Sequence, residues 1–184
     1  MQYCELFSLL QNRRSCRKFQ NRAIPEYDIH RVIEAGRWCP SSHNDQNTIT
    51  IRVKDADMKE KLRKSTSLIM TNHEDFDPFY GAPEILVVMR NADTDKSLGI
   101  MDGTLVMSNM ILAAETLDLG TCWINTAQYN HTFIWSVMPE LLNRAGIKCE
   151  DKLPYIGVGY LAIGYRNCRI EPPLPRKENR IYEI

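Results

Sequence analysis

Residues 98–124 read LGIMDGTLVMSNMILAAETLDLGTCWI, and this stretch decides the fold class. Between residues 98 and 119, apolar side chains occur on nearly every face of a helix instead of along one stripe. Such a helix belongs at the centre of a core or across a subunit interface. We expect Gly120 to end the helix and residues 121–124 to form a short strand.

The flanking sequence supplies the other elements of the fold. Residues 48–53 alternate and are rich in β-branched side chains, which predicts a strand, and Pro83 leads into a second, buried strand at 84–90. Residues 155–165 predict a last strand that contains three glycines. Helices are expected at 3–13, from Pro25 to near Trp38, at 55–70 and at 131–144, with Tyr27 on the buried side of the second. Long helices with about four strands predict an α+β domain.

Bulk composition narrows the functional class. The 23 basic and 23 acidic residues balance without a long run of one sign, so we expect neither nucleic-acid nor membrane-surface binding. We find no signal peptide and no apolar run of about 18 residues. The six cysteines are scattered without a C-x-x-C pair, which argues against a metal site and favours reduced thiols in a cytoplasmic protein.

Residues 13–19, RRSCRKF, form what we call the arginine segment. It is too charged for a core element, so one interpretation is a solvated basic face. The alternative is an anion site, because Arg13, Arg14 and Arg17 present forks of donors suited to phosphate oxygens and Ser15 adds a hydroxyl. On a continuing helix Arg13 and Arg17 would share a face.

Residues 39–47, CPSSHNDQN, form what we call the polar loop. It is either a surface turn or a binding surface of backbone and amide groups for a flat heterocycle. We interpret His43 as a loop histidine rather than a catalytic one, and Cys39 as a small filler rather than a nucleophile. The proline-rich end of the chain carries further basic residues in Pro175-Arg176-Lys177, which add to a possible anion site.

The glycines at 157 and 159 imitate the dinucleotide fingerprint G-x-G-x-x-A. The fingerprint requires a helix directly after it, whereas here the β-type alternation continues. We therefore expect these glycines to allow close strand packing.

Taken together, these segments resemble the nitroreductase family of FMN-dependent oxidoreductases. The matching features run in family order along essentially the whole chain: RRSCRKF at 13–19, CPSSHNDQ at 39–46, GAPEILVV at 81–88, the helix and strand at 109–124, and the IGY and PRK motifs between 163 and 177. Each motif is weak singly, but five in order are strong.

The resemblance implies an α+β, three-layer fold with a central mixed or antiparallel sheet flanked by helices. Residues 1–184 would be a single FMN-binding domain, with 166–184 as an extended C-terminal tail. The long central helix would lie at the interface of a homodimer whose two FMN sites are built from both subunits.

The resemblance also implies site residues. Arg13, Arg14, Ser15 and Arg17 would contact the phosphate, ribityl chain and pyrimidine edge of FMN, and Arg176 would bind the phosphate. The partner subunit would contribute Pro40, Ser41, Ser42 and Asn44, and Ile124 and Asn125 would lie near the ring. No side chain would be catalytic, because hydride passes from NAD(P)H to flavin N5 and then to a nitroaromatic, quinone or similar acceptor in a ping-pong sequence.

Three departures from the family pattern leave the substrate open. Asn47 replaces the usual proline, Cys39 replaces alanine, and Leu174 stands where many members carry a second lysine. Residues 72–81 are short and acidic, so whether they form a lid is undecided. A specialised flavoenzyme on the same fold, or a non-catalytic FMN-binding redox module, remain the alternatives.

Overall fold

A four-stranded sheet forms the centre of the molecule in the computed structural model, which describes residues 3–129, 137–150 and 152–184. Its strands are β1 (Thr48–Val53), β2 (Glu84–Asn91), β3 (Leu119–Ile124) and β4 (Tyr155–Tyr165). They lie in the order β1-β2-β4-β3, and every neighbouring pair is antiparallel. The strands predicted at 48–53 and 155–165 are confirmed at both ends.

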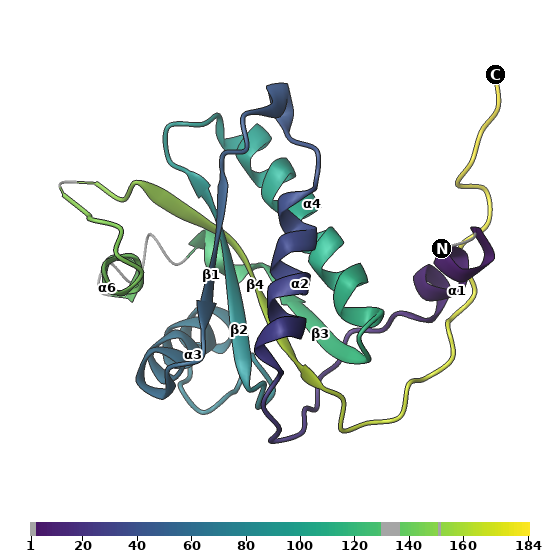
Figure 1. Cartoon of the computed structure of the whole chain (residues 1–184), viewed down its shortest axis with the longest axis horizontal. Helices are drawn as coiled ribbons and strands as arrows, with labels where there is room; N and C mark the ends of the chain where they lie inside the picture. The colour runs from purple at the N-terminus through teal and green to yellow at the C-terminus, as the bar shows by residue number, and fades with distance from the viewer. Residues whose placement is uncertain (1–2, 130–136, 151) are drawn as a thin grey trace.

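Helices cover both faces of this sheet (Figure 1). On one face lie α2 (Glu26–Arg37) and α4 (Lys96–Glu115), and on the other lie α3 (Ala56–Thr71) and α6 (Val137–Arg144). Because successive strand residues point to opposite faces, the buried strand β2 feeds two cores. Val87 belongs to the core under α3 and α6, and Val88 to the core under α2 and α4. The predicted three-layer α+β fold is therefore confirmed.

The central helix α4 ends earlier than predicted. It stops at Glu115, a turn with Asp118 at φ 57° follows, and β3 begins at Leu119. Gly120 thus lies inside the strand, where an added Cβ would come within 2.7 Å of the Cβ of Cys16. The glycine permits a close approach of two chain segments, and Asp118 makes the left-handed turn that a helix-ending glycine would have made.

Close packing buries one side of α4 against the sheet. A Cβ on Gly103 would meet the side chain of Val158 at 2.8 Å, which shows how tightly the helix sits on β4. By length and composition alone α4 also satisfies the criteria for a membrane span. One side of α4, including Val106, Met107, Met110 and Ala114, belongs to the core under α2 and α4.

Two other helix predictions need correction or completion. Tyr27 does not join the buried side of α2: it is 73% exposed and lies under the guanidinium of Arg31. The predicted start of the helix at 131–144 falls outside the described residues, and its described part is α6. The short 3₁₀ turns η1 (Ser42–Asn44) and η2 (Asn125–Tyr129) complete the elements.

Both ends of the chain project from the sheet on the same side (Figure 1). Helix α1 (Tyr3–Asn12) has no buried residue, and its apolar side chains Leu6, Phe7 and Leu10 are exposed. Residues 166–184, which we call the tail, run in extended form beside it. The apolar face predicted on this first helix is therefore only partly covered by the described residues: Phe7 and Leu10 share a shallow hollow with Pro173–Arg176 of the tail.

Candidate functional site: a cationic cavity between the two ends of the chain

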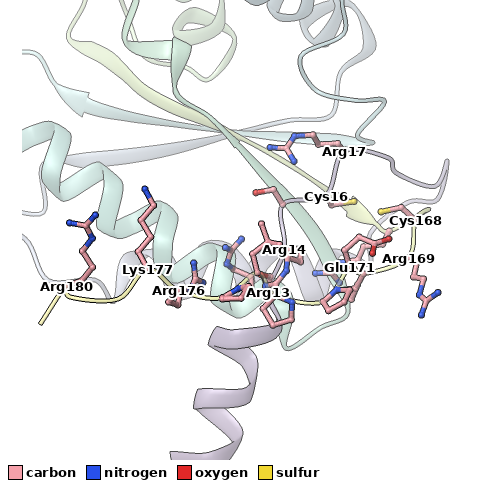
Figure 2. Close-up of a pocket in the computed structure, with 17 residues that line it drawn as sticks. Arg13, Arg14, Cys16, Arg17, Cys168, Arg169, Glu171, Arg176, Lys177 and Arg180 are labelled. Atoms are coloured by element: carbon pink, nitrogen blue, oxygen red, sulfur yellow. Dashed lines mark hydrogen bonds between the residues drawn. The ribbon is translucent and has the colours of Figure 1, made fainter.

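A cavity of about 850 Å³ lies between the arginine segment and the tail, and we call it the arginine cavity (Figure 2). Among the described residues, eight cationic side chains and one acidic side chain, Glu171, line it. The cations are Arg13, Arg14 and Arg17 from the arginine segment and Arg166, Arg169, Arg176, Lys177 and Arg180 from the tail. This excess of positive charge in a concave surface is suited to an anion.

The arginine segment reaches the cavity as an extended strand-like piece, so the helical case in which Arg13 and Arg17 would share a face does not apply. Helix α1 ends at Asn12, after which Ser15 bridges Thr121 in parallel and Phe19 bridges Arg166 antiparallel. The segment is also not wholly solvated, because Cys16 and Phe19 are buried in the core. These two apolar anchors fix the backbone and leave Arg17, between them, exposed at the surface, while Arg13 and Arg14 before them are half-buried.

Two guanidinium groups at the cavity have an unused donor. Arg14 donates through Nη1 to the carbonyl oxygens of Gln11 and Arg13, at 2.8 and 2.6 Å, yet its buried Nη2 has no acceptor in the described structure. Arg166 is paired with Glu115, and its buried Nε likewise has no acceptor there. Buried donors are normally satisfied, so these atoms point to a missing acceptor such as an anionic ligand.

Three further cations of the cavity are not neutralised by the protein itself. Within the described ranges, no ion pair involves Arg13, Arg17 or Arg176. The predicted convergence of arginines from the first and last parts of the chain is therefore present in the structure. Arg13, Arg14, Ser15, Arg17 and Arg176 all line the same cavity.

The polar loop does not reach this cavity within one chain. It lies at the opposite end of α4 from the arginine segment and the tail (Figure 1). Of the predicted residues in it, Ser41 instead lines a separate hollow of about 380 Å³ between α2 and β1. Pro40, Ser42 and Asn44 are thus separated from the arginines in the single chain, as a contribution from a partner subunit would require.

The polar loop is held in a strained conformation. His43, Asn44 and Gln46 have φ values of 51°, 58° and 52°, a region that costs residues other than glycine about 1–2 kcal/mol each and asparagine less. Two hydrogen bonds oppose this cost: Ser42 N donates to Asp102 Oδ1 at 3.0 Å, and Gln46 N donates to Ser41 Oγ at 3.1 Å. Strain of this kind concentrates where a loop must present a fixed surface.

Asp102 is the anchor of the polar loop from α4. Its side chain is buried, with 4% exposure, and its second oxygen Oδ2 has no hydrogen-bond donor among the described residues. Burial raises the pKa of the nearby Cys39 thiol, and the negative charge of Asp102 raises it further. A raised pKa keeps Cys39 a neutral thiol, which supports its interpretation as a filler rather than a nucleophile.

Ile124 and Asn125 lie where β3 ends, and neither lines the arginine cavity. Ile124 is buried in the core under α3 and α6, whereas Asn125 is exposed at the start of η2. Gly157 and Gly159 lie within the uninterrupted strand β4, where an added Cβ would come within 2.5 Å of Ala127 O and 2.6 Å of Trp123 Nε1. The interpretation of these glycines as close-packing positions is confirmed.

Sequence reasoning missed four residues of this region. Arg166, Arg169 and Arg180 line the arginine cavity, and Asp102 anchors the polar loop. The signal for Asp102 was an acidic residue within an otherwise apolar helix. The three arginines could have been found by noting that cations recur along the whole tail and not only at Arg176.

Comparison with known proteins agrees with this architecture. A sequence profile of the nitroreductase family matches residues 10–160. A protein of Methanothermobacter thermautotrophicus, with the provisional name NADH dehydrogenase/NAD(P)H nitroreductase, is 27% identical over 121 residues, which are 65% of this chain and 60% of that protein. A relative in Archaeoglobus fulgidus with the same provisional name is 26% identical over 125 residues, which are 65% of this chain and 67% of that protein.

Solved structures share the fold over the full length of the chain. A nitroreductase with bound FMN from Bacteroides fragilis has a TM-score of 0.81 and 22% identity over 98% of each chain. Another with bound FMN, from Desulfitobacterium hafniense, has a TM-score of 0.83 and 20% identity over all of both chains. Since the family profile spans well over half of the sequence and the fold agrees, this chain belongs to the nitroreductase family.

Proposed function

We propose that the protein is an FMN-dependent oxidoreductase that takes hydride from NAD(P)H and passes it to a small acceptor such as a nitroaromatic or a quinone. The observation that carries this proposal is the convergence of cations from both ends of the chain on one cavity. Membership of the family, the FMN of the solved relatives and the provisional names of the archaeal relatives support it.

The residues at the arginine cavity fit the phosphate end of FMN. A phosphate monoester carries a charge of about −1.5 to −2 at neutral pH and offers three strong acceptor oxygens. Arg13 and Arg176 have no ion-pair partner in the described chain, and Arg14 and Arg166 each keep a buried unpaired donor. We assign Arg13 and Arg176 to the phosphate, because they come from the two walls of the cavity.

The remaining residues of the arginine segment would orient the rest of the cofactor. Arg14 and Ser15 are assigned to the ribityl chain, and Arg17 to the pyrimidine edge of the ring, where its fixed positive charge stabilises negative charge. When bound, FMN supplies the hydride-carrying atom, N5. The protein then has to position the ring and exclude competing groups, so we assign no nucleophile or general base.

A homodimer would complete the site. Helix α4 leaves an apolar stripe exposed at Leu98, Met101 and Leu105, which are 38%, 61% and 42% exposed and share one helix face. A twofold pairing of these stripes with antiparallel helices would bring the polar loop of one subunit toward the arginine cavity of the other. The exposed apolar side chains of α1 would gain further packing partners in the same assembly.

The dimer is tested by placing a charge in the stripe. We expect Leu105→Glu to sediment as a monomer at micromolar concentration and to lose flavin, because a buried unpaired charge costs several kcal/mol at an interface. Leu68→Glu is the matched control, since Leu68 is equally exposed, at 41%, on α3 behind the sheet. A Leu105→Glu protein that stays dimeric and keeps its flavin would refute the proposed interface.

The cofactor site is tested by colour and titration. The purified wild type should show the visible bands of oxidised flavin. We expect Arg17→Ala and Arg176→Ala to weaken FMN binding about 100-fold, because each loses charge-assisted hydrogen bonds worth about 1.5–3 kcal/mol apiece. Arg144→Ala on α6, on the other side of the sheet, is the control. Full flavin occupancy in both cavity variants would refute the placement.

Activity separates an enzyme from a flavin-binding module. We expect steady NAD(P)H oxidation when a quinone is added to the flavin-loaded protein. Flavin that stays tightly bound but is never reduced by NADH or NADPH would favour a non-catalytic redox module.

A further inference from the structure

Two cysteines face each other at the wall of the arginine cavity. Both Cys16, in the arginine segment, and Cys168, in the tail, line it, and their sulfur atoms point toward one another in Figure 2. The proximity of Cys168 also contributes to raising the pKa of the Cys16 thiol. Cys16 is 2% exposed, whereas Cys168 is exposed to solvent.

Backbone pairing brings the two cysteines together. Phe19 bridges Arg166, and Asn167 N donates to Lys18 O at 2.8 Å. The same Lys18 oxygen accepts from Cys16 Sγ at 3.2 Å. One carbonyl group therefore contacts the sulfur of Cys16 and the backbone directly before Cys168.

The side of the cysteine pair that faces β3 is closely packed. A Cβ on Gly120 would meet Arg166 Cγ at 2.7 Å and Cys16 Sγ at 2.9 Å, so Cys16 cannot retreat toward β3. Cys168, by contrast, lies in an extended stretch, 167–184, in which every residue is exposed. A fixed buried thiol beside an adjustable exposed one is the arrangement that disulfide closure needs.

We propose that Cys16 and Cys168 form a peroxide-responsive dithiol site, which closes into a disulfide and joins the arginine segment covalently to the tail. This goes beyond the proposed reductase activity and does not depend on it. A hydroperoxide transfers one oxygen to Cys168 Sγ, giving a sulfenic acid and releasing water or an alcohol. Cys16 Sγ then attacks that sulfur: the S–S bond forms, the S–O bond breaks, and hydroxyl leaves with the Cys16 proton as water. Two thiols thus supply the two electrons that reduce one peroxide.

The order of oxidation follows from access. Cys16 is 2% exposed and burial raises its pKa, so it is shielded from peroxide and reacts second, with the oxidised Cys168 beside it. The solvent-exposed Cys168 meets the peroxide first. Cys122, which is buried in β3 with a pKa that burial also raises, is shielded from the same reagent.

For the test, the full-length protein is purified and reduced, and is then treated with a few equivalents of hydrogen peroxide. The thiols that remain free are labelled with N-ethylmaleimide. Peptide mapping should find one cross-linked pair containing Cys16 and Cys168, reversible by dithiothreitol. The cross-link encloses most of the chain, so we expect the melting temperature of the oxidised protein to rise by about 5–15 °C.

Two serine variants make the outcome decisive. Cys168→Ser, at an exposed position, should fold normally and lose both the cross-link and the rise in melting temperature. Cys4→Ser, which removes another exposed thiol on α1, should behave as wild type. The proposal is overturned if Cys16 and Cys168 are both still labelled after peroxide, if the cross-link joins a different pair, or if it lowers the melting temperature.

Discussion

Replacing Asp102 by alanine should separate folding stability from cofactor binding. The side chain contributes one hydrogen bond to Ser42 N, worth about 1.5–3 kcal/mol for a charged acceptor. Its other oxygen is buried without a donor in the described chain, a defect that costs about 1–3 kcal/mol. Because the two effects nearly cancel, we expect Asp102→Ala to shift the melting temperature by less than about 4 °C.

Cofactor binding should change much more. The strain at His43 and Gln46, about 1–2 kcal/mol each, is comparable to the energy of the lost bond, so the polar loop should relax without its anchor. If the polar loop completes the partner's flavin site, FMN affinity should fall about tenfold or more. Asp102→Asn, which keeps an acceptor at Oδ1, should bind FMN within about threefold of wild type.

The assay is FMN titration by flavin fluorescence, with thermal unfolding and sedimentation measured on the same samples. A wild-type FMN dissociation constant in Asp102→Ala would show that the polar loop does not contribute to the site. Equal loss in Asp102→Asn and Asp102→Ala would show that the Ser42 contact is not the cause.

Two further predictions concern stability. Gly157→Ala should destabilise the fold by about 1–3 kcal/mol in urea unfolding, because its Cβ would lie 2.5 Å from the backbone oxygen of Ala127; an unchanged urea midpoint would contradict this packing. Hydrogen bonds from Arg52 and then Lys54 lower the pKa of Glu26 from 4.5 to about 2, so its ion pairs stabilise the fold above pH 4.5 and are lost as pH falls toward 2. Glu26→Gln should therefore be less stable than wild type at pH 6, with the difference shrinking between pH 4.5 and 2; a difference independent of pH would refute this.

The local sequence pattern was enough to predict the strands of the sheet. Residues 48–53 and 155–165 carry β-type alternation bounded by turn-forming sequence, and both strands were predicted to the residue. The end of α4 was missed because Gly120 looks like a helix-ending glycine, whereas its lack of a side chain serves a contact with Cys16. That contact joins segments about 100 residues apart and leaves no local trace.

The candidate site was predicted as a set of residues but not as a conformation. The charges of the arginine segment suggested a solvated helix end, while burial of Cys16 and Phe19 and the bridge to Thr121 impose an extended backbone. The anchoring of the polar loop by Asp102 depends on a tertiary hydrogen bond 60 positions apart in sequence. Pairings of this kind follow from the packed fold and not from composition or periodicity.

The two walls of the arginine cavity come from residues 13–17 and 166–180, and this has a consequence for biosynthesis. The N-terminal wall is synthesised first and the tail last, and the last strand, β4, ends at Tyr165, directly before the tail. If the arginine cavity holds FMN as proposed, cofactor capture requires the tail, a part of the chain that the sheet does not need. On that proposal, chains that terminate between Tyr165 and Arg176 would keep every described strand of the sheet yet stay colourless, and yellow colour would report synthesis through Arg176.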